Sequence, residues 1–171
     1  MSCDHGHTRR GALRLIGGGA LILGAPALSG CSGGPETGPV EVAWDRDTCE
    51  LCRMIIGDAR FTAQVHGGDK RKIYKFDDIG CVVNWLNDKS WAAAKETEIW
   101  VADNASTRQA LVWLPAREAF YQPGLHSPMN YNFGAFKDNA PERVPFERVT
   151  NKILADIPNH ICPVPGRSTA V

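Results

Sequence analysis

The chain has 171 residues, of which 43% are hydrophobic and 22% are charged. This length suits one ordinary domain, and the apolar content is high enough to bury a core, which argues against disorder through most of the chain. Nineteen basic residues balance nineteen acidic ones, so no broad cationic face indicates a nucleic-acid partner. The six cysteines are irregularly spaced and too few for a disulfide framework.

The first thirty residues differ from the rest of the chain. Arg9 and Arg10 open a short basic stretch, and residues 13–28 are almost wholly small and apolar. This run is short for a membrane-spanning helix and predicts a signal peptide over residues 1–30, with the paired arginines suggesting twin-arginine export. It ends in Leu28-Ser29-Gly30-Cys31, which resembles a bacterial lipobox. We therefore expect lipidation at Cys31 and a membrane-anchored protein facing the periplasm; an ordinary signal peptide with a chance cysteine is the alternative.

The first half of the mature chain predicts a hairpin followed by a helix. Residues 31–40 are rich in Gly, Pro, Ser and Thr and predict a flexible tether, while a weak alternation over 40–44 predicts a first strand. Residues 60–66 alternate clearly, and a Gly-Gly turn separates them from a second strand at 72–76. Asp77 or Asp78 can then cap a helix whose apolar residues recur at helical spacing from 79 to 86.

The second half repeats this order more loosely. Strands are predicted at 98–102 and 109–114 around a turn at 103–106, with a further strand at 132–136 and a helix from Pro145 onward. The pattern predicts an α+β fold of two similar small ββα-type halves, residues 41–95 and 96–157, within one domain over 41–157. Residues 158–171 predict a loose C-terminal tail.

Cys49 and Cys52 form a C-x-x-C pair. Such a pair fits a zinc knuckle, a dithiol redox site or part of a soft-metal site. A zinc site would need a second C-x-x-C or a spaced His pair downstream, and the sequence has neither. Haem attachment would need a His directly after Cys52, which is also absent. Redox pairs usually begin a helix, whereas residues 54–57 look extended or turn-like.

Met54 favours the soft-metal reading. Cys52 and Met54 are two residues apart, so in an extended segment both sulfurs project on one face. A thiolate with a thioether suits Cu(I), whereas zinc does not take a thioether. The alternative is that Met54 simply fills the core.

A second candidate segment is the loop His126-Ser127-Pro128-Met129. This loop places the imidazole of His126 near Met129, which is the other thioether of the mature chain. The alternative is that His126 is a solvated loop histidine. Cys81 falls inside the predicted helix and is expected to be a buried free thiol, and nothing decides the state of Cys162. Because the sequence shows no catalytic triad, phosphate loop or paired acid and base, the chain is not expected to be an enzyme.

Four motifs together resemble the NosL family, whose members are lipoproteins that act as copper chaperones for nitrous oxide reductase. They are D-x-C-x-x-C-x-M-x-I at residues 47–56, F-x-A-Q at 61–64, Y-K-F-D-D-I-G-C at 74–81, and S-P-M…A-F at 127–136. The resemblance covers residues 44–140 and the lipobox. It implies an α+β fold of two similar halves, binding of one Cu(I), and delivery to the copper centres of the reductase together with its maturation proteins.

The resemblance also implies a ligand set. The second Cys and the Met of the first motif fall on Cys52 and Met54, and the Met of S-P-M falls on Met129. Cys49 and Asp47 match the motif as well and, with His126, are further candidates. The alternatives from other classes are a thiol–disulfide oxidoreductase using Cys49 and Cys52, and a structural zinc-binding module.

Overall fold

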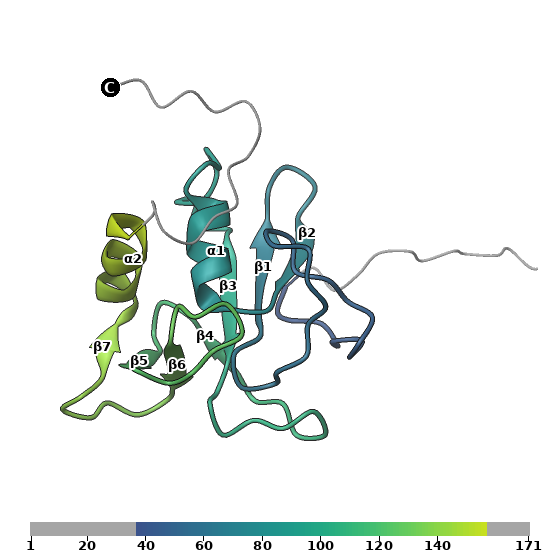
Figure 1. Ribbon diagram of the computed structural model, residues 1–171. Coiled ribbons are helices and arrows are strands. Elements are labelled where there is room, and N and C mark those ends of the chain that lie inside the picture. The colour runs from purple at the N-terminus through teal and green to yellow at the C-terminus, as the bar shows by residue number, and fades with distance from the viewer. Residues whose placement is uncertain (1–36, 157–171) are drawn as a thin grey trace, which may run out of the picture. The chain divides into compact units, whose positions relative to one another are not determined.

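The computed structural model describes residues 37–156, so the expected signal peptide, Cys31 and the expected tail with Cys162 lie outside the described residues. These residues form two antiparallel sheets and two helices (Figure 1). The elements are β1 (Ala63–Gly67), β2 (Lys72–Phe76), α1 (Ile79–Leu86), β3 (Glu98–Ala102), β4 (Trp113–Pro115), β5 (Phe120–Pro123), β6 (Phe133–Phe136), β7 (Val144–Pro145) and α2 (Phe146–Ala155). Neither helix is long and apolar enough to cross a membrane.

The first sheet has four strands in the order β2-β1-β3-β4. The predicted hairpin is confirmed: β1 pairs antiparallel with β2, with Ala63 opposite Phe76. On the other side β1 pairs with β3, with Ala63 opposite Val101. Because side chains alternate along a strand, Ala63 and Val65 face the core while Gln64 and His66 lie on the opposite face.

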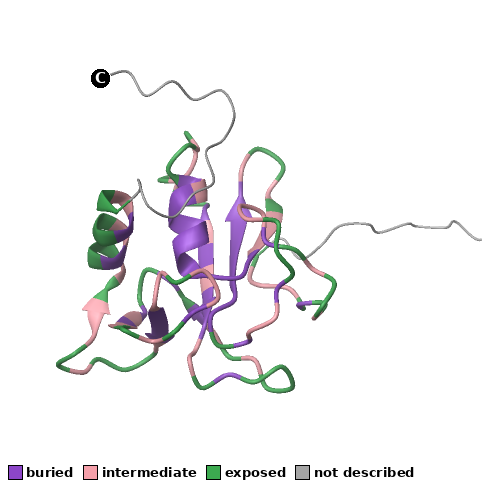
Figure 2. Ribbon diagram, viewed as in Figure 1, coloured by how far each residue is buried: buried purple, intermediate pink, exposed green. Residues whose placement is uncertain are grey.

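The helix predicted after the hairpin is confirmed as α1, and it packs against β1 and β2. The Asp78 carboxylate accepts a hydrogen bond from the Gly80 N–H at 2.9 Å and thereby caps the helix. Seven of the eight helical residues are buried, and Figure 2 shows this helix and β1 as the most continuously buried elements. The first turn of α1 is therefore held in place both by its cap and by packing on the sheet.

Residues 38–40, where the expected tether meets the expected first strand, contact the opposite face of the sheet. Val40 donates its N–H to the Gln64 side chain at 2.9 Å and accepts from the same side chain at 2.8 Å, while the Gly38 N–H donates to the Glu98 carboxylate at 2.7 Å. The prediction of a strand at 40–44 is wrong, because side chains and not a neighbouring strand bond its backbone: Gln64 bonds Val40, and Lys75 donates to the Glu41 carbonyl. The last residues of the expected tether thus lie against the sheet.

The second sheet has three strands in the order β6-β5-β7 and packs with α2. Helix α2 was predicted, and it buries Val149 and Ile153 while its outer side is exposed (Figure 2). The strand predicted at 109–114 is shorter than expected, since β4 begins only at Trp113. Strands β5 and β7 were not predicted; each is short and contains a proline, which weakens the strand signal.

The α+β prediction is confirmed, with two antiparallel sheets that each carry a helix. The second half is more than a single ββα unit. Strands β3 and β4 lie beyond residue 95 yet complete the sheet begun by β1 and β2. The Asn104 N–H also donates to the Ala135 carbonyl at 2.7 Å, so the two sheets are joined through the backbone.

Candidate metal centre

The C-x-x-C motif forms a tight hairpin, which we call the knuckle (residues 47–56). The Cys49 N–H donates to the Met54 carbonyl at 2.8 Å, the Arg53 N–H donates to the Cys49 carbonyl at 3.0 Å, and Thr48 and Ile55 form an isolated antiparallel bridge. Arg53 takes a positive φ of 65° to close the turn, a conformation that favours glycine. The segment is therefore not the extended strand from which a shared face for Cys52 and Met54 was predicted.

The knuckle brings its two cysteines against the first turn of α1. The sulfur atoms of Cys49, Cys52 and Cys81 all lie within 4.8 Å of one another. Cys49 and Cys81 are completely buried, whereas Cys52 is half-buried. No disulfide joins these three thiols. The structure thus places three soft donor atoms together, one of them at the surface.

The three thiols shift one another's pKa values because hydrogen bonds link them. The Cys81 thiol donates to Cys49, and together with the backbone N–H groups of Cys52 and Asp77 this lowers the pKa of Cys49 to about 5 against the opposing effect of burial. The same Cys81 contact, aided by the Met54 N–H, lowers the pKa of Cys52. Donation to both neighbours, with burial, raises the pKa of Cys81. Cys49 is therefore the sulfur most readily available as a thiolate, the form that binds metals.

The S-P-M loop is fastened to the same end of α1. The Ser127 hydroxyl donates to the Asp78 carboxylate at 2.5 Å, and the Met129 N–H reaches the same oxygen at 3.4 Å. Tyr131 accepts a hydrogen bond from the Asn84 side chain at 3.0 Å. Asp78 therefore holds both the helical turn that carries Cys81 and the loop that carries Met129.

The predicted site residues differ in how they are placed. Met129 is half-buried and packs against the core, and Met54 is 53% exposed at the end of the knuckle. Asp47 accepts from the Lys75 ammonium at 2.5 Å and from the Ala43 N–H at 2.7 Å. Burial acts to raise the pKa of Asp47, but these hydrogen bonds and the nearby cations outweigh it and lower the pKa. His126 is exposed. The carboxylate of Asp47 thus braces the knuckle and does not belong to the group of cysteines.

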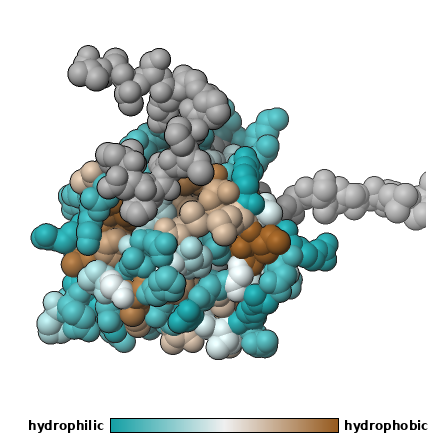
Figure 3. All heavy atoms as spheres, in the orientation of Figure 1, coloured by the Kyte–Doolittle hydropathy of each residue, from teal (hydrophilic) through white to brown (hydrophobic). Residues whose placement is uncertain are grey.

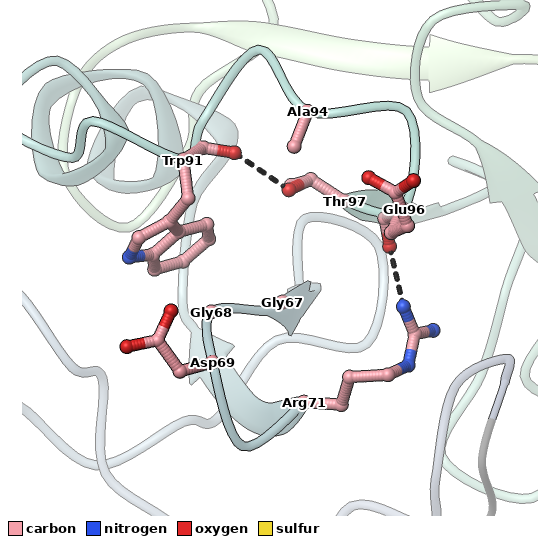
Figure 4. A pocket seen from close by; sticks show the side chains of 8 residues that line it. All are labelled: Gly67, Gly68, Asp69, Arg71, Trp91, Ala94, Glu96 and Thr97. Carbon is pink, nitrogen blue, oxygen red and sulfur yellow. Dashed lines mark hydrogen bonds between the residues drawn. The ribbon is translucent and has the colours of Figure 1, made fainter.

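A pocket of about 260 Å³ lies at the turn between β1 and β2. Figure 4 shows the Trp91 ring forming one wall, with the Thr97 hydroxyl donating to the Trp91 carbonyl and Arg71 donating to the Glu96 carbonyl. A Cβ at Gly67 would lie 2.7 Å from the Trp91 ring, so glycine is required beneath the indole. The lining contains no cysteine or methionine, and β2 separates this pocket from the end of α1 that carries the thiols.

The residue that sequence reasoning missed is Cys81. Its burial agrees with the expectation of a thiol within the helix, but its contact with the C-x-x-C pair was not predicted. A signal was available, since the cap at Asp78 places residue 81 in the first turn of α1. What the sequence did not show is that the knuckle crosses this turn.

The sequence profile of the NosL family matches residues 39–143. A comparison with curated protein sequences finds no match. Among solved structures, the crystal structure of the copper chaperone NosL from Shewanella denitrificans is similar, with 18% sequence identity, a TM-score of 0.48, and coverage of 70% of this chain and 89% of that one. Because the profile spans most of the described domain, the chain belongs to the NosL family.

Proposed function

We propose that this protein binds Cu(I) through sulfur ligands and passes the ion on by ligand exchange, without catalysing a reaction. The observation that carries the proposal is the group of three cysteine sulfurs within 4.8 Å of one another, of which only Cys52 reaches the surface. Thiolates and thioethers are the donors that Cu(I) prefers. A chaperone also needs one accessible ligand at which an acceptor can enter.

The thioethers are proposed to complete the donor set. Met54 lies two residues after Cys52 in the knuckle and is 53% exposed, and Met129 is carried by the loop fixed to Asp78. Asp47 is given no ligand role, since its carboxylate is bound to Lys75. His126 is given none because it is not grouped with the three cysteine sulfurs. Cys49, which is completely buried among the three cysteines, is included as a ligand in this proposal.

The alternative functions receive less support from the described residues. A redox pair is expected at the start of a helix, but Cys49 and Cys52 lie in a hairpin with Cys49 fully buried. A structural zinc site needs four protein ligands, and the described part of the chain brings three cysteines together with no fourth His, Asp or Glu. Membership of the NosL family supports copper delivery to nitrous oxide reductase and its maturation proteins as the destination.

The copper-binding proposal predicts a dependence on thiol oxidation. We expect anaerobically purified, reduced protein to bind one Cu(I), and protein oxidised to the disulfide to bind it only after reduction, because a disulfide sulfur cannot act as a thiolate. Native mass spectrometry with Cu(I) added gives the stoichiometry, and thiol labelling gives the redox state. Equal Cu(I) affinity in both redox states would show that the cysteines are not ligands, and thiol–disulfide turnover that survives loss of both Met54 and Met129 would favour the oxidoreductase.

We further propose that a lipid on Cys31 anchors the protein to a bacterial membrane, with the domain in the periplasm. The lipobox-like sequence at residues 28–31 supports this. Wild-type protein is expected to partition into detergent, whereas Cys31→Ser should remain aqueous or be incorrectly processed. Wild-type protein found wholly in the aqueous phase would exclude the anchor.

A further inference from the structure

Access from solvent differs among the three cysteine sulfurs. Cys49 and Cys81 are completely buried, whereas Cys52 is half-buried. The chain beside Cys52 is open to solvent, because the Arg53 side chain is 69% exposed and Ile55 is 57% exposed. Figure 3 shows apolar surface on the side of the molecule where Figure 1 places this part of the chain. A reagent the size of a protein can therefore reach Cys52 and neither of the other two sulfurs.

Any two of the three thiols are close enough to be oxidised to a disulfide. The three sulfurs lie within 4.8 Å of one another, so a bond of about 2.05 Å requires any pair to approach by less than about 3 Å. Oxidation is expected in the periplasmic location proposed above, because disulfides form and persist outside the cytoplasm. An oxidised pair cannot offer thiolates to a metal until it is reduced again.

A disulfide between Cys49 and Cys81 would be out of reach of an external thiol. Thiol–disulfide exchange requires a thiolate to attack one of the two bonded sulfurs, so its rate depends on access. Both sulfurs of this pair are completely buried. The Cys52 sulfur, however, lies within 4.8 Å of each of them and can attack either one. That attack moves the disulfide to a pair that includes Cys52.

We propose that Cys52 is the point at which a dithiol reductase regenerates the reduced protein, and that the three cysteines exchange disulfides so that any oxidised pair comes to include Cys52. This inference goes beyond copper binding. It makes the protein a substrate of thiol–disulfide exchange and not its catalyst. The partner is a protein that carries two neighbouring thiols, and its two-electron reduction must precede metal loading whenever the cysteines are oxidised.

Each step conserves atoms and electrons. In the internal step the Cys52 thiolate attacks Cys49 of the buried disulfide, a Cys52–Cys49 bond forms, and Cys81 leaves as a thiolate. In the external step a reductase thiolate attacks Cys52, a mixed disulfide forms, and Cys49 leaves as a thiolate. The second reductase thiol then attacks its neighbour's sulfur and releases Cys52. The reductase dithiol is oxidised to a disulfide, and two cysteines of this protein receive its two electrons.

The test uses the metal-free, full-length protein oxidised with diamide. Differential alkylation and peptide mapping follow each cysteine separately during reduction by dithiothreitol. We expect wild type and Cys81→Ala to be reduced at similar rates in a single phase, because their disulfides include Cys52. In Cys52→Ala the Cys49–Cys81 disulfide should be reduced about 100-fold more slowly, because it reacts only when the structure opens.

Two controls separate access from folding. In urea that unfolds the chain, the disulfides of all three proteins should be reduced at the same rate, and thermal melts establish that Cys52→Ala is folded in the absence of urea. A capture experiment needs no variant of this protein. Thioredoxin that lacks its resolving cysteine should form a mixed disulfide with Cys52 of the oxidised wild type.

Four results would overturn the inference. They are reduction of folded Cys52→Ala as fast as wild type, absence of a Cys49–Cys81 disulfide in oxidised Cys52→Ala, a slow phase in wild type that matches Cys52→Ala, and capture of thioredoxin on Cys49 or Cys81. None of these measurements uses copper. Each result therefore leaves the copper-binding proposal standing, and a failure to bind Cu(I) would leave this inference standing.

Discussion

Gly80→Ala is expected to destabilise the metal-free protein by about 2–3 kcal/mol, although alanine at this helical position would gain up to about 1 kcal/mol in helix propensity. The reason is the Tyr131 ring. A Cβ at Gly80 would lie only 2.0 Å from Cγ of Tyr131, so the ring must leave the first turn of α1. Because the ring belongs to the segment that carries Met129, we also expect weaker Cu(I) binding. Chemical denaturation and Cu(I) competition measure the two effects.

Gly57→Ala is the matched control for this substitution. The nearest atom to a Cβ at Gly57 is the flexible end of Arg108, 3.8 Å away, so we expect a change within about 0.5 kcal/mol. Adding Tyr131→Ala to Gly80→Ala should cost less than Tyr131→Ala does in the wild type, because the clash has already displaced the ring. A Gly80→Ala protein as stable as the wild type would mean that Tyr131 does not rest on α1.

Between about pH 4 and pH 6 the protonation of Asp77 and Asp78 should make the free energy of unfolding of the reduced, metal-free protein fall as the pH rises, although the lowered pKa of Cys49 opposes this above about pH 5. Burial raises the pKa of Asp77 to about 6 and the pKa of Asp78 to about 6, above the value of about 3.9 in an unfolded chain. The folded state therefore binds more protons in this interval. A difference of about 2 pKa units corresponds to about 3 kcal/mol for each group as an upper estimate.

Asp77→Asn isolates one of these two contributions. The asparagine oxygen can still accept the hydrogen bond that Asp77 receives from the Gly57 N–H at 3.3 Å, so the change removes mainly the charge. We expect the variant to match the wild type near pH 4 and to exceed it in stability near pH 7. Asp103→Asn, at a carboxylate that braces a loop turn through the Ala105 N–H, is the control. Urea unfolding curves with parallel pH dependence for wild type and Asp77→Asn would contradict the prediction.

The sequence predicts the central part of this fold because each local signal agrees with the tertiary contacts. The alternation in β1, the glycine turn after it and the cap at Asp78 all specify the same hairpin and helix. The failure at residues 40–44 has a different cause. That segment alternates weakly like a strand, but distant side chains bond its backbone, Gln64 at Val40 and Lys75 at Glu41. Such side chains leave no periodic pattern in the segment itself.

The residues of the candidate site also divide into those that the sequence predicts and those that it does not. The C-x-x-C-x-M and S-P-M motifs single out Cys52, Met54 and Met129, and the structure fastens the second motif to α1 through Ser127 and Asp78. Cys81 is predicted from the sequence only as a buried thiol, because a cysteine among apolar helical residues has the pattern of a core residue, and the sequence does not show that the knuckle crosses its turn. The backbone at Arg53 takes a left-handed conformation, which arises from closing the hairpin around the cysteines.

The knuckle has a second consequence, which concerns solubility. Strand β2 is the outermost strand of its sheet, and the Glu50 N–H donates to the Lys75 carbonyl on that strand at 2.8 Å while the Lys75 ammonium donates to the Glu41 carbonyl. The chain around the cysteines thereby shields part of an edge that would otherwise offer unpaired backbone groups to another molecule. Substitutions that loosen the knuckle should expose this edge and promote self-association, so a loss of function in cells can arise from aggregated protein as well as from a change at the cysteines.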